Sequence, residues 1–240
     1  MPKLNFLSNN MLKIIAAISM CLDHIGYIFF PRVAIFRIIG RIAFPIFAYM
    51  IAEGCKHSRH KLRYFLTVFI VGTVCQVVYY IAMQDIYMNI LLTFSLSIVL
   101  IYSLQLVKKC FDLDKSLLFM ILSGILFMVL VLGVFFLTYY VRFDYGFLGV
   151  MLPVFVSLFH SVNRLKPYLL DNKLVSVITF SIGLVLMCLF SHTVYRYFSL
   201  ISIVFVLLYS GNRGKLKMKY FFYFFYPLHL ALLYGIAMLI

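Results

Sequence analysis

The sequence predicts an all-α, polytopic integral membrane helical bundle of about nine transmembrane helices with a cytoplasmic N-terminus. Hydrophobic residues make up 65% of the 240, and the mean hydropathy is +1.07. A soluble globular chain is closer to half apolar, and its share of charged residues is about twice that of this chain. The apolar residues form nine stretches with little sequence left between them, so we expect one transmembrane domain over residues 1–240.

Each stretch is assigned as a span because a membrane-crossing helix needs about 20 mostly apolar residues. The sixth and eighth stretches are short, so whether they cross the bilayer completely is left open. In order, the candidate spans are residues 11–30, 33–54, 64–83, 87–107, 116–138, 146–162, 174–191, 195–210 and 220–239.

Basic residues alternate between the loops. They gather in 56–63, 108–115, 164–173 and 213–219, whereas the other loops hold only Arg32, Arg142 and Arg196. The positive-inside rule makes the first set cytoplasmic, together with the N-terminus. The net charge of +14 is therefore a signal of membrane topology, and no nucleic-acid partner is expected. The five scattered cysteines contain no CxxC pair, so we expect neither a disulfide framework nor a thiolate metal site.

Charge inside the spans is concentrated in the first two. Asp23 and His24 lie in the first stretch, and Arg37 and Arg41 lie in the second. An intramembrane charge costs at least ~2.5–3.5 kcal/mol, so such residues persist where they are paired and used. By helical rise, Asp23 and His24 lie roughly 18–20 Å up a ~30 Å core, level with Arg41. We therefore expect a membrane-embedded functional site.

Neighbouring residues on a helix point about 100° apart, so Asp23 is not expected to orient His24. Asp23 is instead expected to pair with Arg41 or Arg37, which lie one turn apart on one helix face. That ion pair can also be a purely structural lock between two helices. His24 is then available as a general base, because the ordinary pKa of histidine suits proton transfer near neutral pH. His229, in the last stretch, reaches a similar depth and is either part of the same site or a packing histidine.

Lys13 precedes His24 by eleven residues, which places both on one helix face about 16 Å apart along the axis. A cation at the cytoplasmic mouth and a base at depth suit a long phosphorylated acyl carrier.

Three further residues have metal-ligand spacing on one helix face, namely Glu53, His57 and His60. They lie among basic residues at a membrane edge, so we expect a solvated loop there and no metal. Asp144, beside Arg142, has the position of a surface ion pair at the outer rim.

Several motifs together resemble the TraX family, which comprises bacterial membrane proteins named for N-terminal acetylation of conjugative pilin. The resemblance runs from about Leu12 to Leu230 and rests on LKIIAAISMCLDHIG, RIIGRIAFPIFAYMIAEGCKHSR, NILLTFSLSIVL, DYGFLGVMLPVF and YFFYFFYPLHL. The spacing of Lys13 and His24 is also similar to that in the first helix of acyltransferase type 3 membrane families. These resemblances imply an acyltransferase-like domain in the bacterial inner membrane, with acetyl-CoA as co-substrate, His24 as base and Lys13 at the carrier phosphates. They also mark family motif positions without defined roles at Asp23, Arg37, Arg41, Glu53, Asp144 and His229.

Three functions follow as hypotheses. The first is an acetyltransferase that moves acetyl from acetyl-CoA directly to a protein N-terminus or an envelope glycan. Its catalytic residues would be His24, Asp23 and His229, with substrate bound by Lys13, Arg37, Arg41, Glu53 and Asp144. The second is a small proton-coupled transporter that uses Asp23, His24 and His229 as a relay. The third is a non-catalytic membrane protein that assists conjugation or surface assembly. The sequence leaves the acceptor and the oligomeric state open.

Overall fold

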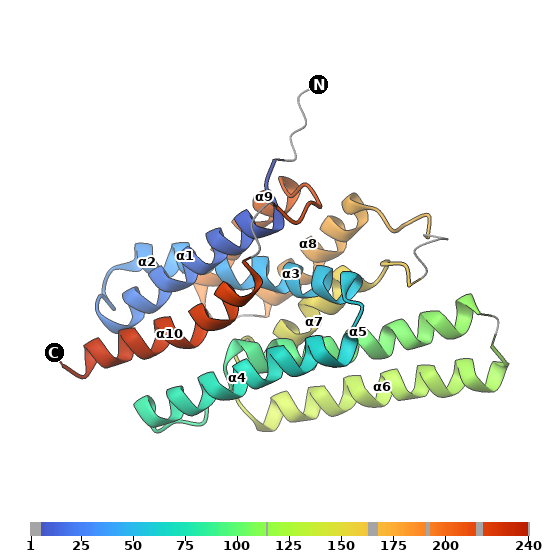
Figure 1. The fold of residues 1–240 in the computed structure, drawn as a ribbon, viewed down its shortest axis with the longest axis horizontal. Coiled ribbons are helices and arrows are strands. Elements are labelled where there is room, and N and C mark those ends of the chain that lie inside the picture. Colours follow the sequence, from blue (N-terminus) through green and yellow to red (C-terminus); the bar gives the residue numbers. More distant parts are fainter. Residues whose placement is uncertain (1–5, 114, 163–167, 191–192, 215–217, 240) are drawn as a thin grey trace. The chain divides into compact units, whose positions relative to one another are not determined.

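A computed structural model describes residues 6–113, 115–162, 168–190, 193–214 and 218–239. Over these residues the chain is helical, with only two isolated β-bridges, Leu7–Tyr209 and Met88–Phe143. This confirms the predicted all-α class (Figure 1). Parts of two predicted basic loops lie outside the described residues, including Arg164, Lys166, Lys215 and Lys217.

The helices follow one another with short connections. In chain order they are α1 (Asn9–Ile28), α2 (Ala34–Gly40), α3 (Ala43–His57), α4 (Lys61–Met83), α5 (Ile90–Asp112), α6 (Leu117–Tyr140), α7 (Gly146–Ser157), α8 (Lys173–Leu189), the 3₁₀ helix η1 (Val194–Ile201), α9 (Ser202–Leu207) and α10 (Lys219–Ala237).

Five helical segments among the described residues are long and apolar enough to cross a membrane. They are 9–28, 34–57, 61–81, 90–112 and 117–140. The remaining apolar helices are shorter, at 146–157, 173–189, 194–207 and 224–237. The chain is therefore a helical membrane protein, and the count of nine spans and its orientation stay predictions.

The chain forms two compact units. The first comprises Met1–Met50, Thr73–Asp85 and Leu184–Ile240, and the second comprises Ile51–Gly72 and Ile86–Gly183. Helices α3, α4 and α8 contribute residues to both units. The prediction of one domain over residues 1–240 stays a prediction.

In the first unit, α1 packs against α2 and α10, and α2 packs against η1. Ser8 caps α1, because its hydroxyl accepts a hydrogen bond from the Met11 amide at 3.3 Å. Two glycines allow α1 and α2 to approach closely. A Cβ atom at Gly26 would lie 2.3 Å from Cβ of Phe36, and one at Gly40 would lie 2.3 Å from Cβ of Asp23.

The predicted continuous span 33–54 is divided by a turn at Arg41 and Ile42. The Ile42 amide bonds the Ile39 carbonyl at 3.2 Å, which is the tighter i−3 pattern of a 3₁₀ turn. Pro45 explains the break, because it has no amide hydrogen for the Arg41 carbonyl four residues back and its ring crowds that carbonyl.

The predicted helix 195–210 also differs from the structure. It begins as the 3₁₀ helix η1 and becomes α-helical only over Ser202–Leu207. The Ser199 hydroxyl donates to the Arg196 carbonyl at 2.6 Å, three residues back, which supports the tighter winding.

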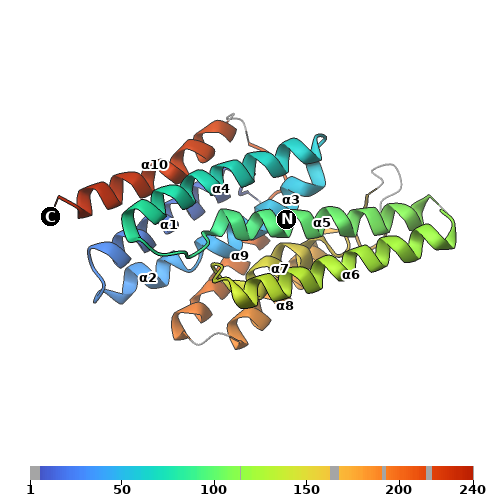
Figure 2. The same cartoon turned by 90° about the horizontal axis from the view of Figure 1, so that it is seen from below.

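In the second unit, α5 packs against α6 and α7, as both views show (Figures 1 and 2). Asn89 caps α5 with its side-chain oxygen and donates from its Nδ2 to the Gly72 carbonyl at 2.8 Å. The Ser97 hydroxyl of α5 donates to the Val150 carbonyl of α7 at 2.8 Å. Most large apolar side chains of α6 are exposed, as expected of a helix that faces lipid.

Candidate functional site

A charged trio in the first unit joins α1 to α2. Nη1 of Arg37 lies 3.1 Å from Oδ1 of Asp23, and Nη2 of Arg41 lies 3.0 Å from Oδ1 and 3.1 Å from Oδ2. The predicted pairing of Asp23 with these arginines is therefore confirmed, and both take part. The two arginines reach one carboxylate because they lie four residues apart. Arg41, the C-cap of α2, still has helical backbone geometry, and its amide donates to the Arg37 carbonyl at 3.2 Å.

The trio carries a formal net charge of +1, from one carboxylate and two guanidinium groups. The Arg41 side chain is only 12% exposed and the Asp23 side chain 19%. Arg37 is more open and also lies over the Tyr27 ring, with its guanidinium carbon 5.5 Å from the centroid. In such a poorly hydrated place, an excess positive charge acts strongly on any group that enters.

His24 and His229 meet next to this trio. Nδ1 of His24 lies 3.1 Å from Nε2 of His229, although 205 residues separate them. His24 directly follows Asp23 in α1, so the histidine pair lies on the same helix as the carboxylate of the trio. The convergence predicted for His24, Asp23, Arg41 and His229 is present within the first unit, and Arg37 joins them through Asp23.

The hydrogen bonds of the pair determine which ring nitrogens carry protons. Nδ1 of His229 lies 3.0 Å from the Phe225 carbonyl, which can only accept, so this nitrogen bears the hydrogen. In a neutral His229, Nε2 is then an acceptor, and Nδ1 of His24 must donate to it. The neutral His24 ring therefore keeps its lone pair on Nε2, in the tautomer that a general base needs.

Aromatic rings hold His229 in this orientation. Phe225 stacks on its ring, with centroids 5.2 Å apart, and Tyr226 meets it edge-on at 5.4 Å. His229 is 6% exposed. The aromatic packing that made His229 ambiguous in the sequence thus coexists with its contact to His24.

Lys13 lies on the same helix as His24 and contacts the same partner helix. Its Nζ is 5.8 Å from the centroid of the Phe222 ring in α10. Lys13 precedes His24 in α1, and Phe222, the partner of Lys13, likewise precedes His229, the partner of His24, in α10. Helices α1 and α10 therefore run in the same direction.

Glu53 and Asp144 belong to the second unit. The Tyr87 hydroxyl donates to Oδ1 of Asp144 at 3.1 Å, and the Thr93 hydroxyl donates to its carbonyl at 3.0 Å. These contacts connect Asp144, just before α7, to Tyr87, just before α5, and to Thr93 within α5. The binding roles predicted for Glu53 and Asp144 stay predictions.

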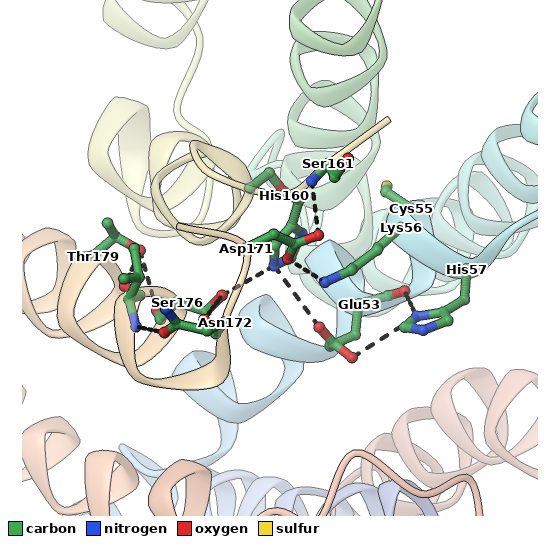
Figure 3. A network of polar contacts seen from close by, with 12 residues as sticks. Glu53, Cys55, Lys56, His57, His160, Ser161, Asp171, Asn172, Ser176 and Thr179 are labelled. Carbon is green, nitrogen blue, oxygen red and sulfur yellow. Dashed lines mark hydrogen bonds and ion pairs between the residues drawn. The ribbon is translucent and has the colours of Figure 1, made fainter. Parts of the chain in front are cut away.

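Glu53 takes part in a polar network that Figure 3 shows. Its carboxylate lies 3.8 Å from Nδ1 of His57 and 3.9 Å from Nε2 of His160. Lys56 forms an ion pair with Asp171, which also accepts a hydrogen bond from the Ser161 amide at 2.9 Å. Neither His160 nor Asp171 was predicted from the sequence as a site residue.

Burial and charge shift the pKa values of two groups in this network that lie between helices. Burial lowers the pKa of His160 to about 3, and Lys56 contributes in the same direction. For Asp171, burial alone would raise the pKa. The hydrogen bonds from Lys56 and the Ser161 amide outweigh it, so the pKa of Asp171 lies below its ordinary value. The network thus keeps His160 neutral and Asp171 ionised near neutral pH.

The possible metal ligands of the sequence do not come together as a set. His57 lies near Glu53, but Nδ1 of His57 is engaged with the Glu53 carbonyl at 2.9 Å. Across the described parts of the chain, no group of three His, Cys, Asp or Glu side chains is arranged to hold a metal ion.

The fold and site define a class: a polytopic helical membrane protein with an ion-paired carboxylate and a histidine pair among apolar helices. The chain belongs to the TraX protein family, whose pattern matches residues 8–237.

Two curated proteins are similar over shorter stretches. One is an uncharacterized protein of Rickettsia prowazekii (strain Madrid E), 50% identical over 40 residues, which are 17% of this chain and 16% of the relative. The other is named "Probable fimbrial assembly protein FimC, serogroup H1", from Dichelobacter nodosus. It is 33% identical over 72 residues, which are 28% of this chain and 30% of the relative. The matches thus cover less than a third of either relative. No solved structure matches the chain significantly.

Proposed function

We propose that this protein is a membrane-embedded acetyltransferase that moves acetyl from cytoplasmic acetyl-CoA to an amine or hydroxyl acceptor, with His24 as general base. The observation that carries the proposal is the hydrogen-bond chain from the Phe225 carbonyl through His229 to His24. It leaves Nε2 of His24 as the basic atom, beside two arginines whose charge would stabilise an oxyanion. Membership of the TraX family supports the same reading.

Each site residue receives a role under this proposal. Nε2 of His24 removes the proton of the acceptor, and His229 holds the tautomer. Arg37 and Arg41 stabilise the negative charge that develops on the thioester oxygen, and Asp23 fixes both arginines. Lys13 binds phosphate groups of acetyl-CoA. The acceptor would be a protein N-terminus, such as that of pilin, or an envelope glycan.

The proposed setting is the bacterial inner membrane, with nine spans and the N-terminus in the cytoplasm. The parallel course of α1 and α10 supports this topology. If both helices cross the bilayer in the same direction, an odd number of crossings separates them, and the seven predicted between them satisfy this condition. A distant relationship to acyltransferase type 3 proteins is part of the proposal.

The test compares wild type with His24→Ala in detergent, measuring acetyl-CoA binding and slow thioester hydrolysis. Removal of a general base is expected to lower turnover by about 10²–10⁴-fold while binding persists. His60→Ala is the matched control, because His60 is exposed and lies in a loop of the second unit. Full turnover in His24→Ala would refute the proposal.

Two other functions remain as alternatives with their own expected results. A proton-coupled transporter would show proton flux in sealed vesicles that depends on His24 and no saturable binding of coenzyme A. A non-catalytic assembly protein would bind no coenzyme A and would tolerate His24→Ala. The name of the Dichelobacter relative describes a probable fimbrial assembly protein.

A further inference from the structure

The turn 168–172, just before α8, exposes two leucine side chains. Leu169 is 94% exposed, the largest exposed fraction of any large hydrophobic residue in the described part of the chain, and Leu170 is 47% exposed. The backbone closes the turn, because the Asp171 amide donates to the Tyr168 carbonyl at 2.9 Å. Two apolar side chains thus lie outside the protein core on a hydrogen-bonded turn.

Side chains at both ends of this turn attach it to other parts of the second unit. The Tyr168 hydroxyl donates to Oδ1 of Asp112 in α5 at 2.8 Å. The Asp171 carboxylate forms an ion pair with Lys56 of α3 and accepts a hydrogen bond from the Ser161 amide at 2.9 Å, as Figure 3 shows. The polar network therefore fixes the turn from two sides, and the two leucines lie between these attachments.

The two helices that hold the turn end at a membrane surface. Asp112 is the last residue of α5, and Lys56 is the next to last residue of α3. These helices end the segments 90–112 and 34–57, which are both long and apolar enough to cross a membrane. Between them the described chain has one further such segment, 61–81, so both ends come out on the same side of the bilayer. This places the turn at the level of the lipid head groups.

The chain around the turn supplies positive charge. Lys173 directly follows the turn, and the exposed residues Lys109 and Lys115 stand on either side of Asp112 in the sequence. Lysines close to a membrane surface are attracted to anionic head groups. Apolar side chains flanked by lysines are typical of segments that lie in the membrane interface.

We propose that the turn 168–172 is a membrane anchor that inserts Leu169 and Leu170 into a leaflet containing anionic lipid. Transfer of these side chains from water to the acyl-chain region is favourable, and the neighbouring lysines bind the head groups. Two leucines supply only a small part of the about 1,200–2,000 Å² that a stable protein–protein interface buries, which argues against a protein partner. The bilayer, in contrast, is already adjacent to a chain that spans it. The inference is independent of the proposed acetyltransferase activity.

The test places an environment-sensitive NBD fluorophore on the turn. Leu169→Cys is introduced into full-length protein whose five native cysteines are replaced by serine, and the new cysteine is labelled. His60→Cys is the matched control, because His60 is an exposed polar residue in the loop before α4 of the same unit. Both proteins are placed in nanodiscs of phosphatidylcholine, alone or mixed with phosphatidylglycerol. Fluorescence is quenched from the lipid side by acyl-chain-brominated phosphatidylcholine and from the water side by acrylamide.

We expect brominated lipid to quench the label at position 169 more strongly than the label at position 60, and acrylamide to do the reverse. The protection of position 169 from acrylamide should increase with phosphatidylglycerol and decrease at high salt, since salt screens the attraction of lysines to head groups. Equal quenching of both positions by acrylamide would overturn the anchor. Protection of position 169 from both quenchers would mean that protein covers the leucines, and it would overturn the lipid assignment. Equal protection in both lipid mixtures would overturn the preference for anionic lipid.

A second variant tests whether the hydrogen bonds of the turn position the leucines. Tyr168→Phe keeps the aromatic ring and removes the bond to Asp112. In the Leu169→Cys background this change should reduce quenching by brominated lipid and increase quenching by acrylamide. Tyr140→Phe, at the exposed end of α6, is the control and should change neither. Unchanged quenching in Tyr168→Phe would overturn the role assigned to this attachment.

Discussion

At the scale of single residues, the His24–His229 contact determines which ring nitrogen of a neutral His24 can accept a proton. A histidine base needs one ring nitrogen free and the other anchored. The structure anchors Nδ1 of His24 on a second histidine, which is anchored in turn on the Phe225 carbonyl. Asp23, the neighbour of His24 in sequence, is occupied by the two arginines and does not play this part.

This arrangement predicts unequal effects of substitutions at His229. His229→Leu removes the acceptor for Nδ1 of His24, and His229→Gln can replace it with an amide oxygen. Loss of a buried hydrogen bond costs ~1–3 kcal/mol, so kcat should fall by about 5- to 160-fold in His229→Leu, with the KM for acetyl-CoA nearly unchanged. His229→Gln should recover much of the loss. A purely packing role would give the opposite order, with Leu the better replacement.

How far the sequence predicts this site depends on the range of each interaction. The Asp23–arginine pairing could be predicted, because charges in an apolar span need partners and these lie within 18 residues. The position of His229 along its helix indicated a shared depth, but not a 3.1 Å contact with His24. Lateral packing of helices that are distant in the chain is not encoded in any local pattern. His160 was missed for the same reason, since its partners Glu53 and Ser176 lie on other elements.

At the scale of elements, the close approach of α1 and α2 sets where the charged trio lies. Gly40 stands against Asp23, and a methyl group there would lie 2.3 Å from its Cβ and 2.4 Å from its Oδ1. Arg37 and Arg41 can reach the Asp23 carboxylate because Gly40 has no side chain in the place where the Asp23 side chain packs.

Gly40→Ala should therefore separate α1 from α2 and weaken the trio. Overpacking of this kind typically costs about 1–3 kcal/mol, so we expect a lower unfolding temperature and reduced turnover. The measurement is thermal unfolding in detergent together with the thioester assay. Gly124→Ala in α6 is the control, because a Cβ there meets nothing within 4 Å. Equal behaviour of the two variants would contradict the packing argument.

The element boundaries show what hydropathy can and cannot predict. Long apolar stretches were assigned correctly as helices, because composition alone decides them. The turn at Arg41 and Ile42 and the 3₁₀ start of η1 were not predicted. They depend on Pro45 and on the Ser199 hydroxyl bond, and both lie within stretches whose apolar content is continuous. Helix α7, with 12 residues, is about 18 Å long, which is shorter than a ~30 Å hydrocarbon core.

At the scale of the whole molecule, stability should fall in acid. Between pH ~6.5 and about 3, unfolded His160 binds a proton and buried His160 does not, so stability decreases as pH falls through this range. Asp171 adds to the loss only below its ordinary pKa of ~3.9, as the pH falls toward its lower folded value.

Thermal unfolding of the purified protein at pH 7, 5.5 and 4 measures this effect. The unfolding temperature should drop toward pH 4, and His160→Gln should flatten the dependence. His60→Gln should leave it unchanged, since His60 is exposed to solvent in the loop before α4. A steep pH dependence that persists in His160→Gln would assign the effect to other groups.

The orientation of the whole chain is open to a direct experiment. The alternation of basic loops predicts that residue 60 faces the cytoplasm and residue 140 the opposite side. Single cysteines at these exposed positions, His60→Cys and Tyr140→Cys, are introduced into protein whose five native cysteines are replaced by serine, and intact spheroplasts are treated with a membrane-impermeant maleimide. We expect labelling at position 140 only, with labelling at 60 after permeabilisation. The reverse pattern would invert the topology, and labelling of both in intact spheroplasts would rule out this span count.

The distance between His24 and His229 along the chain also sets a schedule for biosynthesis. Asp23, Arg37 and Arg41 can pair soon after they leave the ribosome, because at most 18 residues separate them. His229 follows His24 by 205 residues, which at about 5–20 residues per second is a delay of roughly 10–40 s. During that interval the nascent protein holds its arginines and their counter-ion but lacks the partner that fixes its base. Under the proposed function, the growing chain would therefore be inactive until α10 has been made and has packed against α1.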